Sequence, residues 1–402
     1  MNTGRKGPFD GIRIIDLTAI VFGPLATQIF GDLGADVIKI EPPEGDQFRN
    51  AQAARSPRMG AAYINSNRNK RSLCLDLKQP EAHAALMRLI AGADVFVHSL
   101  RPQAIAKLGL DYASVKAARE DIVYCSAWGY GSNGPYAGRP AYDDVIQAAS
   151  GVAGLVARTA PDGVPAFAPM VMADKTGALT VTYAIMAALF HRERTGEGQE
   201  VEVPMFESLA AFNLVEHLAG ASFEPHEDAM GYVRLMSPSR KPYATKDGYI
   251  AVLPYTTRHW RAFFSLAGRA EMLEDPRVND AVARGKAISE LYEIVETIMP
   301  ERETAEWLAM LTQADIPVAP VNSLEDLLED PHLRETGFFV EYDHPGEGRM
   351  RTTAPPTRFS RSPAGLHRHP PRLGEHSREV LAQAGYDEAQ IADLIERGIC
   401  RE

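Results

Sequence analysis

Residues 12–41, IRIIDLTAIVFGPLATQIFGDLGADVIKIE, decide the fold because they contain a strand, a helix and a second strand in succession. The apolar run Ile12–Leu17 is typical of a short buried strand, and Pro24 suits the first turn of a helix that we expect to end at Leu33. A second, largely apolar run, Asp36–Glu41, predicts the next strand. Two strands joined by a helix of this length are expected to lie parallel in one sheet.

The same alternation continues along the first half of the chain. The apolar patterns predict strands at 73–77, 95–97 and 122–125, and helices at 80–91 and 103–108. Strands that alternate with helices favour a sheet with helices on both faces. The sequence therefore predicts an α/β fold whose large domain is built on a doubly wound, largely parallel sheet.

The chain changes character near residue 224, where a polar stretch is typical of a linker. Beyond it, Tyr243–Val252 contains an Asp-Gly pair between two apolar segments, which predicts a β-hairpin, and helical patterns follow. Frequent Pro, Gly and Arg after residue 330 indicate an extended segment that returns to the first domain. We expect a large α/β domain in 1–223, a smaller α+β domain in 224–329, and a return segment in 330–402 that completes the large domain.

Length and charge limit the class of protein. A chain of 402 residues suits two domains, and its net charge of −11 argues against nucleic acid as a partner. Cys74, Cys125 and Cys400 show neither disulfide nor zinc spacing, which suits a reducing compartment. The longest apolar run, which ends at Phe190, is shorter than the ~20 residues that span a bilayer. We expect a cytoplasmic protein with no membrane partner.

The stretch Met172–Leu179, MADKTGAL, opens a long apolar segment with one carboxylate, Asp174. Aspartate is favoured at helix N-caps, where its oxygens accept hydrogen bonds from free backbone N–H groups. A carboxylate in a partly apolar pocket can instead act as a nucleophile toward an activated acyl group. The local sequence favours the N-cap, and both interpretations stay open at this point.

Other motifs of known chemistry are incomplete. The turn after Leu17 lacks G-x-G-x-x-G, which argues against a dinucleotide site with Glu41 as its ribose-binding acid. Gly-x-Ser-x-Gly is missing, so no nucleophile elbow is predicted. His367, His369 and His376 lie among prolines and arginines, which favours a solvated loop over a metal site.

Basic residues follow or lie between several predicted strands. Taken singly, each is most often a solvated surface charge, but their shared position in an acidic protein suggests a ligand rich in phosphate. A helix N-terminus at the carboxyl end of a strand is a further place for a phosphate group. The basic residues are Lys39, Lys70, Arg71, Lys78, Arg101 and Lys107.

Eight stretches in both halves of the chain form an ordered set: Gly11–Asp16, Gly34–Pro42, Asn69–Lys78, Tyr142–Gly151, Thr195–Gln199, Asp247–Tyr249, Ile316–Val321 and Leu373–His376. In this order, and over nearly the whole chain, they resemble the family III CoA-transferases (the CaiB/BaiF family), which include the formyl-CoA and crotonobetainyl-CoA transferases. An ordered match of this extent is more specific than any one motif.

The resemblance implies that Asp174 is the catalytic nucleophile. Its carboxylate would attack an acyl-CoA thioester to give a mixed anhydride, and the CoA thiolate would then form an aspartyl-CoA thioester that a second carboxylic acid consumes. Acyl-CoA thioesters and carboxylic acids are the expected substrates, with no tightly bound cofactor and no metal. The resemblance also implies a ring-shaped chain that forms an interlocked homodimer.

By the same resemblance, CoA binds beside strand and helix ends of the large domain. Lys78, Arg101 and Lys107 are the candidates for contacts with the CoA phosphates, and the implied position beside the nucleophile falls on Tyr142 and Asp143. The full set of implied CoA-binding residues is Val21, Phe22, Leu75, Lys78, Ser99, Leu100, Arg101, Lys107, Leu108, Arg139, Tyr142 and Asp143.

The chain departs from the family pattern in places. Pro42 and Pro140 stand where some members use basic residues, although Arg139 adjoins the second. Residues 160–165 contain no glycine-rich lid like that of the formyl-CoA enzyme, so oxalate and formate are not inferred as substrates. The α-methylacyl-CoA racemases are the alternative class. They need a histidine where this chain has Tyr142, and a tyrosine with a pKa of about 10 is a poor base.

Overall fold

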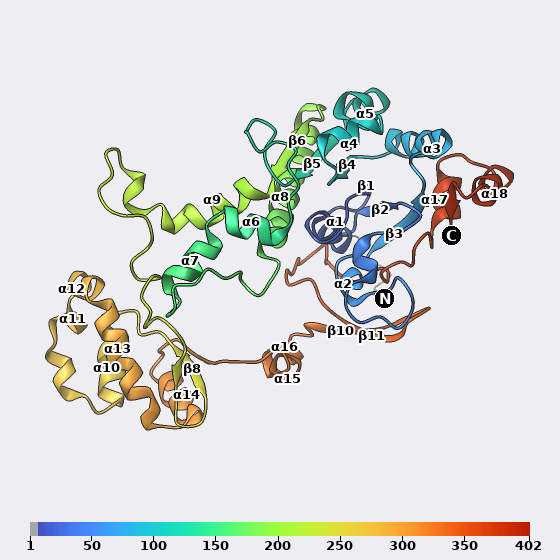
Figure 1. The fold of residues 1–402 in the computed structure, drawn as a ribbon. Coiled ribbons are helices and arrows are strands. Elements are labelled where there is room, and N and C mark those ends of the chain that lie inside the picture. The colour runs from blue at the N-terminus through green and yellow to red at the C-terminus, as the bar shows by residue number, and fades with distance from the viewer. Residues whose placement is uncertain (1–6) are drawn as a thin grey trace. The chain divides into compact units, whose positions relative to one another are not determined.

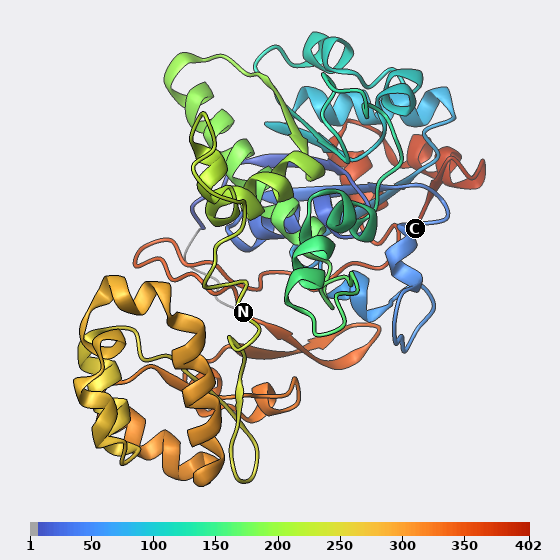
Figure 2. The same cartoon turned by 60° about the vertical axis from the view of Figure 1, so that its left-hand side comes forward.

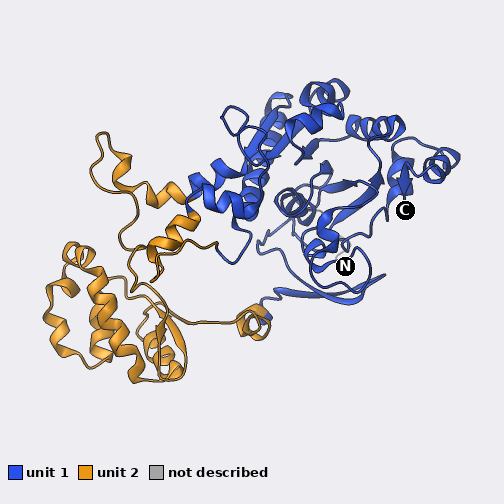
Figure 3. Cartoon of the chain, in the orientation of Figure 1, with its two compact units in different colours: residues 1–151, 168–212, 334–402 blue, residues 152–167, 213–333 orange. Residues whose placement is uncertain are grey.

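The computed structural model of the protein describes residues 7–402, which divide into two compact units (Figure 3). Unit 1 comprises the described residues up to 151 together with 168–212 and 334–402, and unit 2 comprises 152–167 and 213–333. The expected smaller domain, 224–329, lies within the longer segment of unit 2, 213–333, and the chain re-enters unit 1 at 334. Unit 2 also includes 152–167, where the Arg158 guanidinium donates a hydrogen bond to the carbonyl of Met230.

The core of unit 1 is a seven-stranded sheet in the order β12-β3-β2-β1-β4-β5-β6 (Figures 1 and 2). Five neighbouring pairs are parallel, and β12 is antiparallel to β3. The predicted α/β fold with a largely parallel sheet is thereby confirmed. The strands are β1 Arg13–Leu17, β2 Asp36–Glu41, β3 Lys70–Leu75, β4 Val95–His98, β5 Val123–Trp128, β6 Glu200–Pro204 and β12 Cys400–Arg401.

Helices cover both faces of this sheet. Ile15 and Phe96, which pair in register, belong to a buried cluster that also takes residues from α3, α5, α17 and α18. Successive strand residues point to opposite faces, and on the other face α1 and α8 pack against each other and the strands. The helices of unit 1 are α1 Phe22–Asp32, α2 Ala61–Ile64, α3 Pro80–Ala91, α4 Pro102–Lys107, α5 Tyr112–Ala118, α6 Asp143–Ala149, α8 Met172–Thr195, the first part of α9 Met205–His217, α17 Ser377–Gln383 and α18 Glu388–Glu396.

The sheet has a topological switch point between β1 and β4. These strands are neighbours, and their carboxyl ends meet where Leu17 pairs with His98. The connection after β4 contributes Ile105 of α4 and Val115 of α5 to the cluster on one face, whereas α1, which follows β1, packs with α8 on the other. In open α/β sheets a ligand binds in the crevice outside the carboxyl ends of the strands at such a point.

The C-terminal segment is fastened to unit 1 by specific contacts. It contains the hairpin β10 Phe339–His344 and β11 Gly348–Thr353, and it ends in β12, which pairs with β3. The Nδ1 atom of His376 accepts from the backbone N–H of Ser72, and Nε2 of His369 lies 2.7 Å from a carboxylate oxygen of Glu375. The solvated-loop interpretation of these two histidines was therefore wrong, because both are held in the packed return segment.

Unit 2 is built from a small sheet and a set of short helices. The predicted hairpin around the Asp-Gly turn is confirmed by β7 and β8, and β9, which the sequence did not reveal, pairs with β8. An aromatic core that includes Trp260, Phe263 and Trp307 lies under these elements. The elements are α7 Val152–Thr159, β7 Tyr243–Ala244, β8 Tyr249–Val252, α10 Thr257–Leu266, α11 Pro276–Asn279, α12 Ala281–Lys286, α13 Ile288–Ile298, α14 Thr304–Gln313, β9 Val318–Pro320 and α15 Asp326–Glu329, with α16 Pro331–Glu335 at the junction.

Candidate active site

A crevice of about 310 Å³ lies at the switch point, outside the carboxyl ends of β1, β4 and β5. Its walls come from the segments that follow these three strands and from the first turn of α8. The position is the one that the sheet topology favours for a ligand. The residues that line it include Ala19, Ile20, Phe22, Ser99, Leu100, Arg101, Trp128, Tyr130, Arg139, Tyr142 and Asp174.

Asp174 lies in the first turn of α8 and is 8% exposed. The N-cap position of this helix belongs to Val171, whose side chain makes no capping hydrogen bond, so the N-cap interpretation of Asp174 was wrong. The backbone N–H of Asp174 donates instead to Oδ1 of Asp143, over 3.0 Å. The carboxylate of Asp143 thus satisfies a free donor of the first helical turn, and the carboxylate of Asp174 remains directed to the crevice.

The environment of Asp174 favours its neutral form. Burial raises the pKa of the Asp174 carboxyl, and the nearby Asp143 carboxylate raises it further, to about 7. A carboxyl group with this pKa exists in both protonation states near neutral pH. Perturbed carboxyl groups of this kind, in a crevice and with a specific charged neighbour, are typical of catalytic sites.

Gln147, which the sequence analysis did not single out, supports this arrangement. Its Nε2 group donates to Oδ2 of Asp143 over 2.6 Å and to the carbonyl of Met170 over 3.0 Å, and its Oε1 atom accepts from the N–H of Ala168 over 2.9 Å. One buried side chain therefore fixes both Asp143 and the segment that leads into α8. In the sequence, only the four-residue spacing of Asp143 and Gln147 on α6 indicates that their side chains are neighbours on one face of the helix.

Of the two predicted residues that follow β1, Phe22 lines the crevice and Val21 does not, and they are 5% and 7% exposed. Phe22 begins α1, and its ring packs on Gly177, where a Cβ atom would lie 2.5 Å from Cε2 of Phe22. The absence of a side chain at Gly177 lets α8 approach α1 closely. This approach places Phe22 beside the first turn that carries Asp174.

The wall that follows β4 contains Ser99, Leu100 and Arg101. The hydroxyl oxygen of Ser99 accepts from the N–H of Ala19 over 3.2 Å and so joins this wall to the first one. The indole N–H of Trp128 donates to the carbonyl of Leu100 over 2.9 Å. Arg101 is exposed at the end of the same segment, directly before α4.

The segment that follows β5 brings Arg139 and Tyr142 to the rim. The guanidinium of Arg139 lies over the ring of Tyr136, 4.4 Å from its centroid, and Tyr142 is 62% exposed. Backbone N–H groups of this segment are held by the carboxylates of Glu202 and Glu207. These residues therefore provide an aromatic and cationic edge to the crevice that contains Asp174.

Six predicted CoA-binding residues do not line the crevice: Val21 and Asp143, which are described above, and Leu75, Lys78, Lys107 and Leu108. Leu75 is fully buried in the core cluster, and Leu108 packs against the same cluster. Lys78 and Lys107 are exposed, the first just beyond the end of β3 and the second at the end of α4. Lys78 thus follows the carboxyl end of a strand, and Lys107 ends a helix whose first residue, Pro102, lines the crevice.

The other basic residues after strands were misinterpreted as possible phosphate ligands. Lys39 and Lys70 are fully buried, and Arg71 is 4% exposed. Each is paired with a carboxylate: Lys39 with Asp46 at 2.9 Å, Lys70 with Asp16 at 3.0 Å and Arg71 with Asp36 at 2.6 Å. Such internally paired cations are not available to a ligand.

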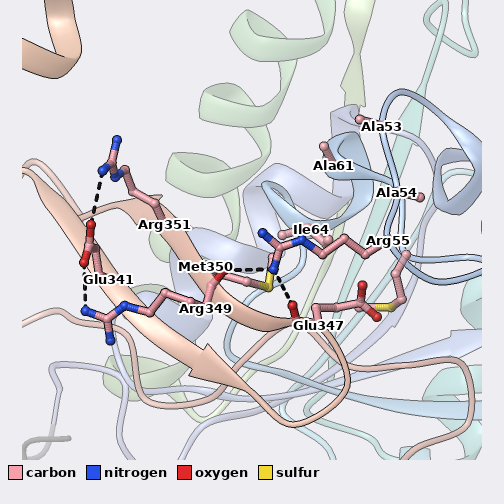
Figure 4. Close-up of a pocket in the computed structure, with 11 residues that line it drawn as sticks. Ala53, Ala54, Arg55, Ala61, Ile64, Glu341, Glu347, Arg349, Met350 and Arg351 are labelled. Carbon is pink, nitrogen blue, oxygen red and sulfur yellow. Dashed lines mark hydrogen bonds and ion pairs between the residues drawn. The ribbon is translucent and has the colours of Figure 1, made fainter.

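A larger cavity of about 480 Å³ lies beside β10 and β11 (Figure 4). Its arginines are already engaged, because Arg349 and Arg351 both pair with Glu341 and Arg55 donates to the carbonyls of Glu347 and Arg349. The buried carboxylate of Glu347 would repel a phosphate or carboxylate. We therefore place the candidate active site at the switch point.

Within residues 7–402, no three His, Cys, Asp or Glu side chains are grouped so that they could hold a metal ion. None of the helices described is long and apolar enough to cross a membrane.

Comparison with known proteins identifies the family. The sequence model of CoA-transferase family III matches residues 9–377. The chain is 33% identical to succinate–glutarate CoA-transferase of Agrobacterium fabrum, over 94% of this chain and 96% of that protein. It is 30% identical to formyl-CoA:oxalate CoA-transferase of Escherichia coli, over 96% of this chain and 98% of that protein.

Solved structures agree with the sequence comparison. A CaiB/BaiF family protein from Brucella suis superposes with a TM-score of 0.80 at 30% identity, over 94% of this chain and 100% of that one. Rv3272 of Mycobacterium tuberculosis superposes with a TM-score of 0.81 at 28% identity, over 94% of this chain and 100% of that one. The chain therefore belongs to CoA-transferase family III and is an enzyme of that family.

Proposed function

We propose that the protein moves CoA from an acyl-CoA thioester to a free carboxylic acid, with Asp174 as the nucleophile. The observation that carries the proposal is the position of Asp174. It is the only carboxylate among the residues that line the switch-point crevice, it is buried, and no described residue donates a hydrogen bond to its side chain. A carboxylate with few hydrogen bonds is a stronger nucleophile than a solvated one.

The proposed reaction conserves the energy of the thioester through two enzyme-bound intermediates. The Asp174 carboxylate attacks the donor carbonyl, the C–S bond breaks, and a mixed anhydride and the CoA thiolate form. The thiolate then attacks the aspartyl carbonyl, which releases the donor acid and leaves an aspartyl-CoA thioester. The acceptor carboxylate repeats these two steps in reverse, so that acyl-CoA leaves and Asp174 is regenerated without net gain or loss of a proton. Water must be excluded, because it would hydrolyse both intermediates.

The raised pKa of Asp174 affects both the pH dependence of the proposed reaction and the energy of the attacking carboxylate. The attacking species is the carboxylate, so the free enzyme loses activity as the pH falls through about 7. Burial destabilises the ionised nucleophile, and attack spreads its charge into the developing oxyanion. Backbone N–H groups at the start of α1 are candidates to stabilise that oxyanion.

CoA is proposed to lie along the carboxyl-end edge of the sheet. Phe22, Ser99 and Leu100 would contact its pantetheine arm inside the crevice. The exposed cations Lys78, Arg101 and Lys107 would contact its phosphates, since charge-assisted hydrogen bonds are the strong ones. Val21 would pack against CoA, and Leu75 and Leu108 would contact it through their backbone or support the residues that do. Arg139, Tyr142 and Asp143 would lie at the thioester end of the bound CoA.

We propose dicarboxylic acids as the first acceptors to test. The relatives named above carry glutarate and oxalate in their names. Arg139 at the crevice rim is a cation suited to a second carboxylate. The missing glycine-rich segment at 160–165 favours the longer acids of this class over oxalate.

Assembly and location are also proposals. The chain leaves unit 1 at residue 213 and re-enters it at 334, which is the connectivity that a closed, interlocking chain requires. We propose an interlocked homodimer in the cytoplasm. Interlocked subunits separate only by unfolding, so light scattering on dilution is expected to show no reversible monomer–dimer equilibrium.

Mass spectrometry of a trapped intermediate tests the reaction. Incubation with a true donor, such as succinyl-CoA, is expected to add the mass of an acyl or CoA group to the peptide that contains Asp174, and Asp174→Ala is expected to show neither adduct nor turnover. Exchange of the α-proton of a 2-methylacyl-CoA with deuterium, without CoA transfer to any acid, would instead identify a racemase.

A further inference from the structure

The turn between β1 and α1 forms one wall of the crevice and has an unusual backbone. Ile20 has a φ of 71°, in the left-handed region. A β-branched residue rarely adopts this conformation, because its Cβ atom crowds the following carbonyl oxygen. Residues in such conformations persist where the surrounding structure holds them, and they are concentrated at functional sites. The contacts that hold Ile20 are therefore of interest.

The carboxylate of Asp46 holds Ile20 directly. The N–H of Ile20 lies 3.1 Å from Oδ1 and 3.2 Å from Oδ2 of Asp46. Asp46 also lies 2.9 Å from Nζ of Lys39, and the two side chains are 1% and 0% exposed. Nζ of Lys39 in turn donates to the carbonyl of Thr18 over 2.9 Å. One buried ion pair thus fixes the turn at two backbone positions, two residues apart.

Neither member of this pair lines the crevice. The residues that they hold do line it, since Ile20 is a wall residue and Phe22 follows two positions later. Between the two anchored positions, the N–H of Ala19 donates to Ser99 on the opposite wall. Any effect of Asp46 on the reaction must therefore pass through the conformation of this turn.

We propose that Asp46, paired with Lys39, is a positioning residue for CoA transfer. It keeps Ile20 left-handed and so sets the wall of Ala19, Ile20 and Phe22 against the bound thioester. The inference rests on the function proposed above for the crevice. A purely local role is the alternative, because Asp46 also accepts from the N–H of Phe48 and caps the short 3-10 helix η1 Gln47–Asn50.

A double substitution separates the two roles. Asp46→Ala removes the acceptor for Ile20 and is expected to lower kcat about tenfold to a hundredfold, as small misplacements at a reacting centre do. Adding Ile20→Gly is expected to restore most of that loss, because glycine adopts positive φ without steric cost. A lost helix cap would not be rescued by a glycine at position 20.

Two further variants serve as controls. Asp46→Asn keeps an acceptor oxygen for Ile20 but loses the charge that pairs with Lys39, so it is expected to weaken the anchor and to lower kcat by less than Asp46→Ala does. Asp111→Ala removes a comparable capping aspartate, which accepts from the N–H of Ser114 in α5, and is expected to leave kcat unchanged. If Asp46→Ala does not fold, hydrogen exchange of the 18–22 peptide in Asp46→Asn decides the matter, since weakened anchoring is expected to accelerate that exchange.

The inference is overturned if Asp46→Ala keeps the kcat of the unmodified enzyme, if Ile20→Gly fails to improve it, or if exchange at 18–22 is unchanged in Asp46→Asn. If the unmodified protein transfers CoA to no acid, the proposed function fails. Calorimetric binding of free CoA then tests the anchor separately: a Kd unchanged by Asp46→Ala refutes the positioning role, and a weaker Kd restored by Ile20→Gly supports it.

Discussion

Two of the aspartates that unit 1 buries, Asp16 and Asp174, lie in opposite electrostatic environments. Burial raises the pKa of Asp16, but the ammonium groups of Lys70 and Lys39 and two hydroxyl donors outweigh burial and lower it to about 2. At Asp174 burial acts in the same direction as the carboxylate of Asp143, and the pKa rises to about 7. Both residues are buried, since Asp16 is 0% and Asp174 8% exposed.

The contrast separates a buried charge that supports the fold, at Asp16, from one that is available for chemistry, at Asp174. Cations and hydroxyl groups form ion pairs and hydrogen bonds with the Asp16 carboxylate. A carboxylate stabilised in this way is a poor nucleophile. No cation among residues 7–402 lowers the pKa of Asp174, so the ionised form of Asp174 is destabilised in the folded protein, and a reaction can relieve this. Natural active sites commonly keep such locally unfavourable groups at some cost in stability.

Asp174→Asn tests the destabilised carboxylate, which is expected to give the largest effect. Loss of the nucleophile is expected to reduce turnover at least about 10³-fold. The folded pKa lies above the unfolded value of 3.8, so the folded protein retains a proton that the unfolded chain releases, and the contribution of this group to stability falls as pH rises from about 4 to about 7. The variant is expected to be more stable than the unmodified protein at pH 8, by at most about 4 kcal/mol.

Chemical denaturation of both proteins at pH 5 and pH 8 measures this effect. The stability difference is expected to be smaller at pH 5, where the Asp174 carboxyl is largely protonated. Equal stabilities at pH 8 would mean that Asp174 carries no electrostatic strain, and full activity in the variant would remove it from the mechanism.

Lys70→Met tests the stabilised carboxylate, Asp16, by removing the cation that pairs with it. It leaves Asp16 buried without its cation at 3.0 Å, and breaking a buried pair in this way typically costs about 3–5 kcal/mol. Thermal unfolding at pH 7 measures the loss. Adding Asp16→Asn is expected to recover part of it, whereas Lys78→Met, on an exposed lysine, is expected to change stability by no more than about 0.5 kcal/mol. A Lys70→Met protein as stable as the control would contradict the role assigned to the pair.

Much of the fold follows from local sequence patterns. The apolar runs in 12–41 and the helical pattern at 80–91 predicted elements that the structure contains, because burial on both faces leaves a strong apolar signal. Strand β12, Cys400–Arg401, could not be predicted, since a two-residue strand depends on a partner more than 300 positions earlier in the chain. The edge strand β6 was missed because its polar and apolar residues alternate without a buried run.

Some residues of the candidate site were likewise predicted from the sequence, and others were not. Phe22, Arg101 and Asp174 line one crevice, and family resemblance had suggested all three. The resemblance did not reveal Gln147 or Asp46, whose importance lies in contacts with distant backbone groups. The basic residues paired inside the sheet were misassigned for the same reason, because a sequence does not show which carboxylate lies beside a lysine.

Asp143→Asn sharpens the contrast by removing the like charge from Asp174. The substituted amide keeps an oxygen that can accept from the Asp174 N–H, while the pKa of Asp174 is expected to fall. The pH profile of kcat/KM is therefore expected to move to lower pH. Asp144→Asn, on the exposed neighbouring position of α6, is the matched control and is expected to leave the profile in place. An unshifted profile in Asp143→Asn would show that burial alone sets the pKa.

The smallest expected effect concerns Lys107, an exposed cation that differs from the buried Lys39 and Lys70 in its partners. No described residue forms an ion pair with Lys107, and its exposed ammonium is free to contact a phosphate. Lys107→Ala is expected to raise KM for CoA thioesters about threefold to tenfold at low salt, with little change in kcat or in KM for the acceptor acid. The difference is expected to shrink as salt screens the contact. Lys116→Ala, on another exposed lysine that lies 5.7 Å from the ring of Tyr112, is the control. If both variants raise KM equally, the effect reflects net charge rather than a phosphate site at Lys107. The absence of an ion-pair partner would then not mark Lys107 as a residue that binds CoA.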